Sequence, residues 1–90
     1  RSLVGSEMCI ETAQALIIEY LEPQLTQEEA DIYRRGRNAK SYTMAKNATM
    51  ADYRKATGLE AVIGYLYLTD QFARAVELTK NAIDGLKLSV

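Results

Sequence analysis

Glu60 is the acidic side chain whose neighbours in the sequence leave it most free to take part in chemistry. The residues three and four positions away, which would flank it on a helix, are all uncharged: Ala56, Thr57, Ile63 and Gly64. An unpaired carboxylate is a candidate ligand for a hard divalent ion such as magnesium, which prefers oxygen donors and often takes only one or two protein carboxylates. The structural alternative is a tertiary salt bridge from Glu60 to Arg54, Arg74 or a partner subunit.

A basic run, Arg34 to Ser41, precedes the apolar stretch that contains Glu60. We expect Gly36 to end a helix and to let the backbone of the following loop approach a duplex closely. Guanidinium and ammonium groups suit phosphate oxygens. The candidate contacts to nucleic acid are Arg34, Arg35, Arg37, Asn38, Lys40 and Lys46. The alternative is a solvated helix end with a charged tail.

The charge distribution supports an anionic partner more strongly than the net charge of −1 does. Residues 1–31 carry seven acids and one base, whereas residues 32–55 carry seven bases and one acid. Such an asymmetry favours a nucleic acid partner for the central block.

Residue types that are absent exclude several classes of site. The chain has no histidine and only one cysteine, Cys9, so a cysteine–histidine nucleophile and the usual zinc sites are excluded. A single cysteine fits a reducing compartment, and we expect a cytoplasmic protein. The longest apolar stretch, Leu59 to Leu68, is too short to span a bilayer.

The 90 residues predict one small all-α domain of about four helices. The first is expected over about residues 7–21, and the second from a capping box at Thr26 and Glu29 to Gly36. A loop follows over 36–47. Thr49 is expected to cap a third helix that reaches Leu68, and the fourth spans about 71–84. The apolar seam of this last helix consists of Phe72, Val76, Thr79, Ile83 and Leu86, and Gly85 is expected to stop it.

Two segments together resemble the Mini-III ribonucleases, a compact bacterial and plastid branch of the ribonuclease III family. They are the basic run from Tyr33 to Ser41 and the helix Thr57 to Leu68, with its Glu-Ala-x-x-Gly pattern from Glu60 to Gly64. The resemblance covers about residues 13–83. It implies an all-α homodimer that cleaves double-stranded RNA with magnesium, in the cytoplasm of a bacterium. It also implies Glu60 as a metal ligand and catalytic residue, and precursors of ribosomal RNA as the substrate.

One departure from the family pattern concerns the signature helix with a Gly-Asp-Ala core, which has no counterpart in the 90 residues. We therefore expect residues 1–90 to be the C-terminal part of a single ribonuclease III-like catalytic domain. Glu60 alone should not hold magnesium stably, so this part should be inactive by itself. A non-catalytic RNA-binding module and a structural dimerisation unit on the same scaffold remain the alternatives.

Overall fold

The computed structural model describes residues 10–39 and 49–86, which form four α-helices and one short 3-10 helix, with no strand among them. The elements are α1 (Ile10–Leu21), η2 (Glu22–Gln24), α2 (Gln27–Asn38), α3 (Met50–Leu68) and α4 (Phe72–Leu86). The prediction of an all-α fold with four helices is confirmed. Residues 7–9 of the expected first helix lie outside the described residues, and α1 begins at Ile10.

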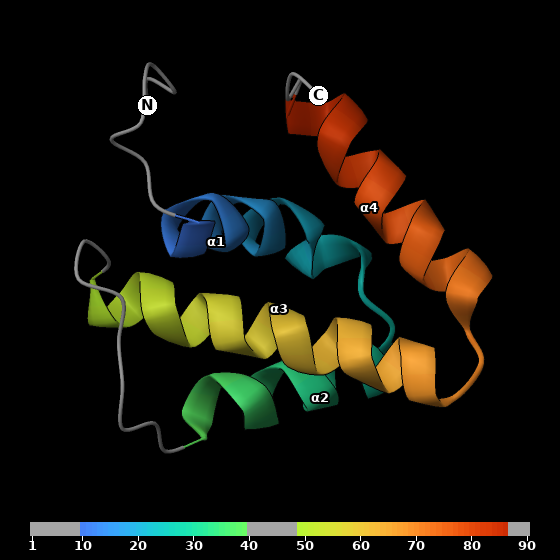
Figure 1. The fold of residues 1–90 in the computed structure, drawn as a ribbon, viewed down its shortest axis with the longest axis horizontal. Helices are drawn as coiled ribbons and strands as arrows, with labels where there is room; N and C mark the ends of the chain where they lie inside the picture. Colours follow the sequence, from blue (N-terminus) through green and yellow to red (C-terminus); the bar gives the residue numbers. More distant parts are fainter. Residues whose placement is uncertain (1–9, 40–48, 87–90) are drawn as a thin grey trace.

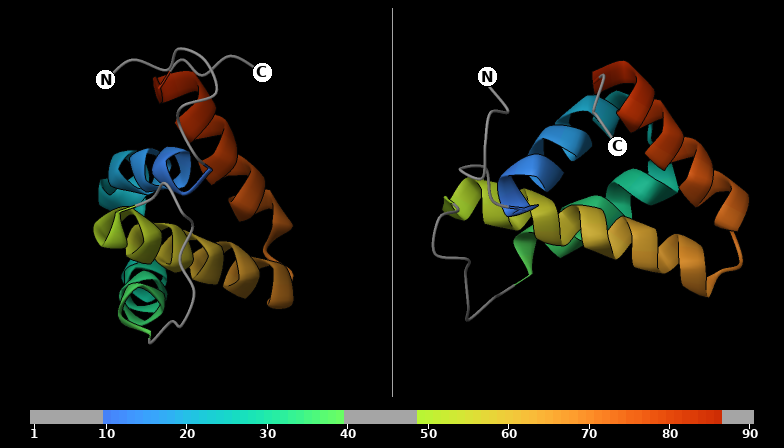
Figure 2. Two further views of the ribbon diagram at one scale, coloured as in Figure 1. Left: turned by 60° about the vertical axis from the view of Figure 1, so that its left-hand side comes forward. Right: turned by 45° about the horizontal axis from the view of Figure 1, so that its top comes forward.

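Helix α3 is the central element of the fold. In Figure 1 it crosses the middle of the molecule, with α1 above it and α2 below it, and the left view of Figure 2 shows the same order. The last helix, α4, rises from the end of α3 towards the end of α1 (Figure 1). Helices α2 and α3 run in opposite directions, so the end of α2 lies near the start of α3 (Figure 1).

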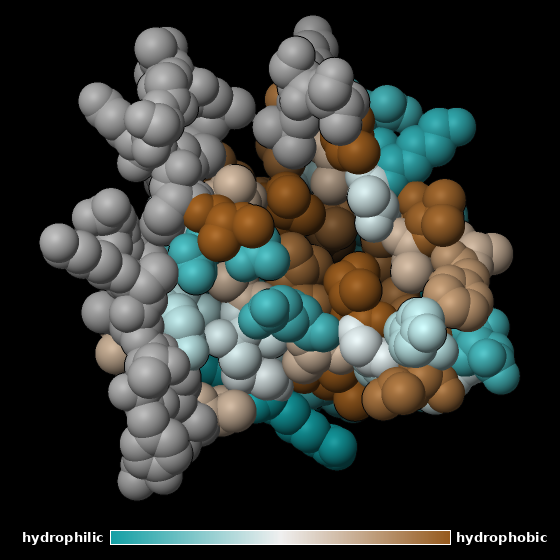
Figure 3. Space-filling view, in the orientation of Figure 1, coloured by the Kyte–Doolittle hydropathy of each residue, from teal (hydrophilic) through white to brown (hydrophobic). Residues whose placement is uncertain are grey.

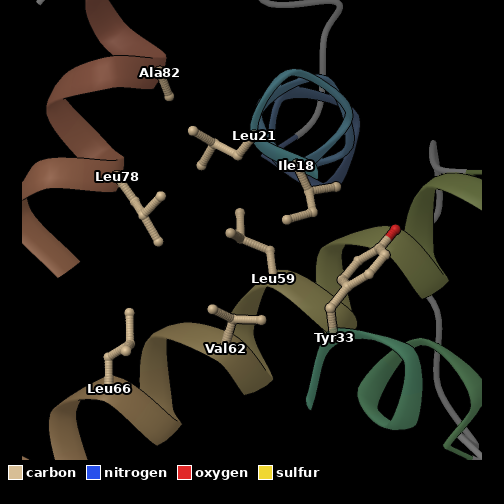
Figure 4. Close-up of a cluster of buried hydrophobic side chains, with 8 residues drawn as sticks. All are labelled: Ile18, Leu21, Tyr33, Leu59, Val62, Leu66, Leu78 and Ala82. Atoms are coloured by element: carbon tan, nitrogen blue, oxygen red, sulfur yellow. The ribbon is translucent and has the colours of Figure 1, made fainter. Parts of the chain in front are cut away.

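The hydrophobic core lies where all four α-helices meet (Figure 4). Its buried members come from α1, α2, α3 and α4 in turn: Ile18, Leu21, Tyr33, Leu59, Val62, Leu66, Leu78 and Ala82. Three of them, Leu59, Val62 and Leu66, lie on one face of α3. Through this face, α3 packs against the other three α-helices. The core therefore fixes the orientation of α3 and of the polar residues on its other faces.

Side-chain caps define the starts of α2 and α3, as the sequence predicts. The Thr26 hydroxyl accepts from the Glu29 amide at 3.2 Å, and the Glu29 carboxylate accepts from the Thr26 amide at 2.9 Å. At the next helix, the Thr49 hydroxyl accepts from the Asp52 amide at 3.0 Å. Each bond satisfies an amide that has no partner within its own helix.

Gly36 does not end α2, contrary to the expectation from the sequence. The helix continues to Asn38, so residues 36–38 belong to its last turn. A Cβ atom at Gly36 would lie 2.6 Å from the Ala61 Cβ and 3.1 Å from the Gly58 Cα. A glycine is required at position 36 because the backbones of α2 and α3 cross closely there. The close crossing, and not the end of a helix, therefore explains this glycine.

The apolar seam expected on α4 does not face the core. Phe72 is 53% exposed and Val76 is 63% exposed, whereas Leu78 and Ala82 point inward. Phe72 packs edge-to-face on Tyr67, with ring centroids 4.9 Å apart. Figure 3 shows apolar residues gathered on the surface around α4. Gly85 does not stop the helix either, because α4 continues to Leu86.

A pair of glycine substitutions in α3 tests the close crossing. A Cβ at Gly58 would lie 2.5 Å from the Tyr33 ring and 2.9 Å from the Tyr33 carbonyl oxygen. A Cβ at Gly64 would meet no described atom within 4 Å beyond its own helix backbone and chain neighbours. We expect Gly58→Ala to lower the free energy of unfolding by about 2 kcal/mol, because the backbone of α2 must move. Gly64→Ala should raise it by about 0.5–1 kcal/mol, since alanine is the better helix former.

Urea unfolding followed by circular dichroism measures both changes. If the two substitutions change the free energy of unfolding equally, in either direction, the backbones of α2 and α3 do not cross closely at Gly58.

Candidate active site and nucleic-acid interface

The Glu60 side chain is exposed on α3 and makes no hydrogen bond or ion pair within the part of the chain that the structure describes. The salt bridges from Glu60 to Arg54 and to Arg74 that the sequence leaves open are absent there. Arg74 pairs with Glu29 and Glu77 instead, and Arg54 contacts no described acid. The carboxylate is therefore available to an ion or to another ligand.

The residues beside Glu60 leave space next to its carboxylate. At Gly64, one turn further along α3, a Cβ would have no described atom within 4 Å other than those of its own helix backbone and its two chain neighbours. Thr57 is half-buried, and its hydroxyl donates to the Tyr53 carbonyl oxygen at 3.0 Å. Ala61 faces α2, where it contacts Gly36. Residues 57, 60, 61 and 64, which share one side of α3, thus have different surroundings, and the open part of that side consists of Glu60 and Gly64.

The basic residues at the end of α2 have different surroundings, although they are close in sequence. Arg34 is exposed and pairs with Asp31, with a guanidinium nitrogen 2.7 Å from a carboxylate oxygen. Arg35 and Asn38 are exposed and have no ion pair or hydrogen-bond partner among the described side chains. Two further candidates, Lys40 and Lys46, lie outside the described residues. Arg35 and Asn38 are therefore the exposed candidates on this helix that no described side chain already engages.

Arg37 is held in place by an aromatic ring. Its guanidinium carbon lies 5.5 Å from the centroid of the Tyr33 ring, and Tyr33 is buried between α2 and α3. Burial raises the pKa of the Tyr33 phenol above its usual value, with the Glu22 carboxylate adding to the shift, so the ring stays neutral beneath the cation. This cation–π contact restrains the guanidinium, which keeps N–H donors for an anion.

Glu60 is near the last turn of α2, because Gly36 contacts its neighbour Ala61, but it lies apart from Arg54 on α3. Arg54, which lies next to the end of α2, precedes Glu60 by six residues, about 9 Å along the axis of α3 and roughly a third of a turn around it. A small anion could not touch both places. A ligand that reaches both must be extended, and a nucleic acid duplex meets this condition.

The ion pair between Glu29 and Arg74 is a strong interaction that the sequence pattern does not predict, because its two residues lie 45 positions apart. Arg74 donates to both carboxylate oxygens of Glu29 at 2.8 Å and to the Gln24 carbonyl oxygen at 2.8 Å. The Glu29 side chain is only 4% exposed. Hydrogen bonding from Arg74 lowers the pKa of the Glu29 carboxyl, and burial opposes this shift only in part. The pair is structural, because it joins α4 to the start of α2.

The matches to known proteins agree with this arrangement. The model of the ribonuclease III domain family matches residues 2–71, which is most of the chain and includes Glu60 and the basic end of α2. The chain belongs to the ribonuclease III family.

Within that family, this domain is similar to bacterial proteins named Mini-ribonuclease 3. It is 49% identical over 76 residues to the protein of Symbiobacterium thermophilum, covering 84% of this chain and 58% of the relative. It is 49% identical over 72 residues to that of Clostridium tetani, covering 80% and 48%. The chain thus spans about half the length of the curated relatives it matches. The family resemblance expected from the sequence is confirmed.

The described residues of this ribonuclease III domain fit a divalent ion at one ligand position. The oxygen donors of Glu60 are exposed and unpaired, as a magnesium ligand requires. Among residues 10–39 and 49–86, however, no three acidic, histidine or cysteine side chains cluster as a metal site would need. The same residues contain no helix long and apolar enough to cross a membrane.

Proposed function

We propose that the protein carrying this sequence is a metal-dependent endoribonuclease that hydrolyses phosphodiester bonds of double-stranded RNA. The observation that carries the proposal is the exposed carboxylate of Glu60, which has no described partner in a domain of the ribonuclease III family. The names of the relatives, Mini-ribonuclease 3, support the same activity.

Glu60 acts in this proposal as a magnesium ligand, held in a fixed position by a helix that is anchored in the core. The bound ion would lower the pKa of a water molecule and offset the negative charge that develops on the phosphate. Arg35, Arg37 and Asn38, with Lys40 and Lys46, hold the backbone of the RNA without reading its bases. Arg34 contributes less, because Asp31 already neutralises it.

The finer parts of the proposal rest on the resemblance. They are a homodimer, a ribosomal RNA precursor as the substrate, and a bacterial cytoplasmic location. The exposed apolar residues on α4 support the homodimer, since they give a second copy a surface to cover. Residues 1–90 form the C-terminal part of a single catalytic domain in this account. They are expected to be inactive alone, because one carboxylate does not complete a catalytic magnesium site.

A cleavage assay with the full-length protein tests the function. A duplex RNA should be cut in the presence of magnesium and left intact with EDTA. Single-stranded RNA and a DNA duplex of the same sequence are the controls, and neither should be cut at a comparable rate. If the duplex RNA is bound but never cut, the protein is a non-catalytic RNA-binding module and the proposal is wrong.

A further inference from the structure

A surface hollow of about 360 Å³ lies where the end of α2 meets the start of α3. Its lining comes from both helices: Arg37, Asn38, Met50, Ala51, Arg54 and Lys55. Three of these side chains are cations and none is an acid. The volume is sufficient for a phosphate group, and the charge suits one.

Two of the three cations are available to a ligand. Neither Arg37 nor Arg54 forms an ion pair with a described acid, whereas Lys55 pairs with Glu19 on α1. Hydrogen bonding to Glu19 raises the pKa of the Lys55 amine, so this side chain stays charged at the edge of the hollow. Arg37 and Arg54 are thus the groups that can exchange water for an anion.

The close helix crossing brings these two arginines together. Arg37 follows Gly36, and Arg54 lies one turn before Gly58, so each arginine is next to the point where the two backbones meet. The Tyr33 ring restrains Arg37 from below. Two guanidinium groups on separate helices can donate hydrogen bonds to one phosphate from two sides. The Asn38 amide adds a neutral donor.

We propose that this hollow binds a phosphate of the RNA backbone. Arg37 and Asn38 contact the phosphate from α2, and Arg54 contacts the same phosphate from α3. The inference rests on the proposed function, because it assigns a second element to the same RNA interface. The contact lies away from Glu60 around α3, so it positions the duplex and takes no part in the hydrolysis.

The test measures the affinity of the full-length protein for a duplex RNA over a range of salt concentrations, with EDTA present to prevent cleavage. Arg54→Ala should weaken binding several-fold and reduce the slope of log K against log salt concentration by about one, as the loss of one phosphate contact requires. Arg54→Lys should restore the slope but not the full affinity, because it loses the bidentate geometry. The matched control is Lys80→Ala on α4, which removes one exposed positive charge and should change neither quantity.

Each outcome decides the matter. If Arg54→Ala behaves like Lys80→Ala while the unchanged protein binds and cuts duplex RNA, the hollow is not a phosphate site. The proposed function then still stands. If Arg54→Ala weakens binding of an acidic peptide but not of the duplex, the ligand class is wrong. If the unchanged protein shows no salt-dependent binding to duplex RNA, both proposals fail. Equal unfolding midpoints of the variants in urea verify that Arg54→Ala leaves the fold intact.

Discussion

Glu60→Gln lowers the rate of duplex RNA cleavage by at least about 100-fold and leaves the fold intact, if Glu60 is a metal ligand. Replacing a partner of a metal ligand already costs 10–100-fold in metal affinity or activity, so replacing the ligand itself should cost no less. The glutamine keeps the size of the side chain and removes only its charge. The fold should tolerate it, because the Glu60 side chain is exposed and has no described partner that would be left unpaired.

Magnesium dependence separates a metal ligand from a structural residue. In the Glu60→Gln variant the magnesium concentration for half-maximal cleavage should rise, and affinity for duplex RNA in EDTA should not change. The matched control is Glu28→Gln, the same chemical change at an exposed position in the first turn of α2. Loss of activity in both variants, or in neither, would remove the role assigned to Glu60.

Arg74→Ala should destabilise the fold by about 3 kcal/mol. The substitution leaves the Glu29 carboxylate, whose side chain is 4% exposed, with only the Thr26 cap as a partner. It also removes the donor to the Gln24 carbonyl oxygen. Breaking one side of a buried ion pair costs 3–5 kcal/mol in other proteins, and we take the low end because the Arg74 side chain is 22% exposed.

The control for this prediction is Arg34→Ala, which removes an exposed ion pair with Asp31 of similar length. Exposed pairs contribute little, so the cost should be no more than about 0.5 kcal/mol. Urea unfolding at pH 7 measures both variants. If both substitutions lower the free energy of unfolding by the same amount, the burial of the Glu29–Arg74 pair adds nothing to its stabilising effect.

The Glu29–Arg74 pair also predicts how stability depends on pH. The pKa of Glu29 is lowered in the folded state, so the folded protein binds this proton less readily than the unfolded chain. The stabilisation is therefore complete above the ordinary glutamate pKa of about 4.3 and is lost as the pH falls below it, towards the lowered value. The urea midpoint should decrease between about pH 5 and pH 3, and less steeply in Arg74→Ala.

The sequence predicted those parts of the fold that local interactions determine. The capping box at Thr26 and Glu29 and the cap at Thr49 gave correct starts for α2 and α3, because each involves residues only three positions apart. Leu68 was the correct end of α3. The helix stops there because Asp70 adopts a positive φ of 60°, and the Gln71 amide donates to the Leu66 carbonyl oxygen. This backbone conformation is unusual outside glycine and was not foreseen.

The parts that depend on tertiary contacts could not be predicted. The sequence predicts Gly36 as a helix terminator, since nothing local distinguishes a terminator from a glycine that makes room for another helix. Its partner, Gly58, lies 22 positions further along, and only the fold shows that the two backbones cross. The sequence predicts a single apolar seam on α4 and, for a similar reason, does not show which side of the helix is buried. Two apolar stripes run along that helix, and the packing of Leu78 and Ala82 decides which one is buried.

The candidate site divides in the same way. Glu60 could be identified as unpaired from its neighbours at helical spacing, and the structure agrees that no described residue neutralises it. In the sequence, Arg54 is one of the bases of residues 32–55 and a possible partner of Glu60. Its place beside Arg37 depends on the antiparallel packing of α2 and α3, although the basic block of residues 32–55 already contained it.

A crystal of the full-length protein grown with manganese in place of magnesium gives the most direct test of whether Glu60 binds the ion. Manganese has an anomalous signal, and its position can be determined without reference to activity. We predict an anomalous peak about 2.1–2.2 Å from a carboxylate oxygen of Glu60. A well-occupied manganese ion that lies more than about 4 Å from that carboxylate, beyond any direct coordination, would contradict the account.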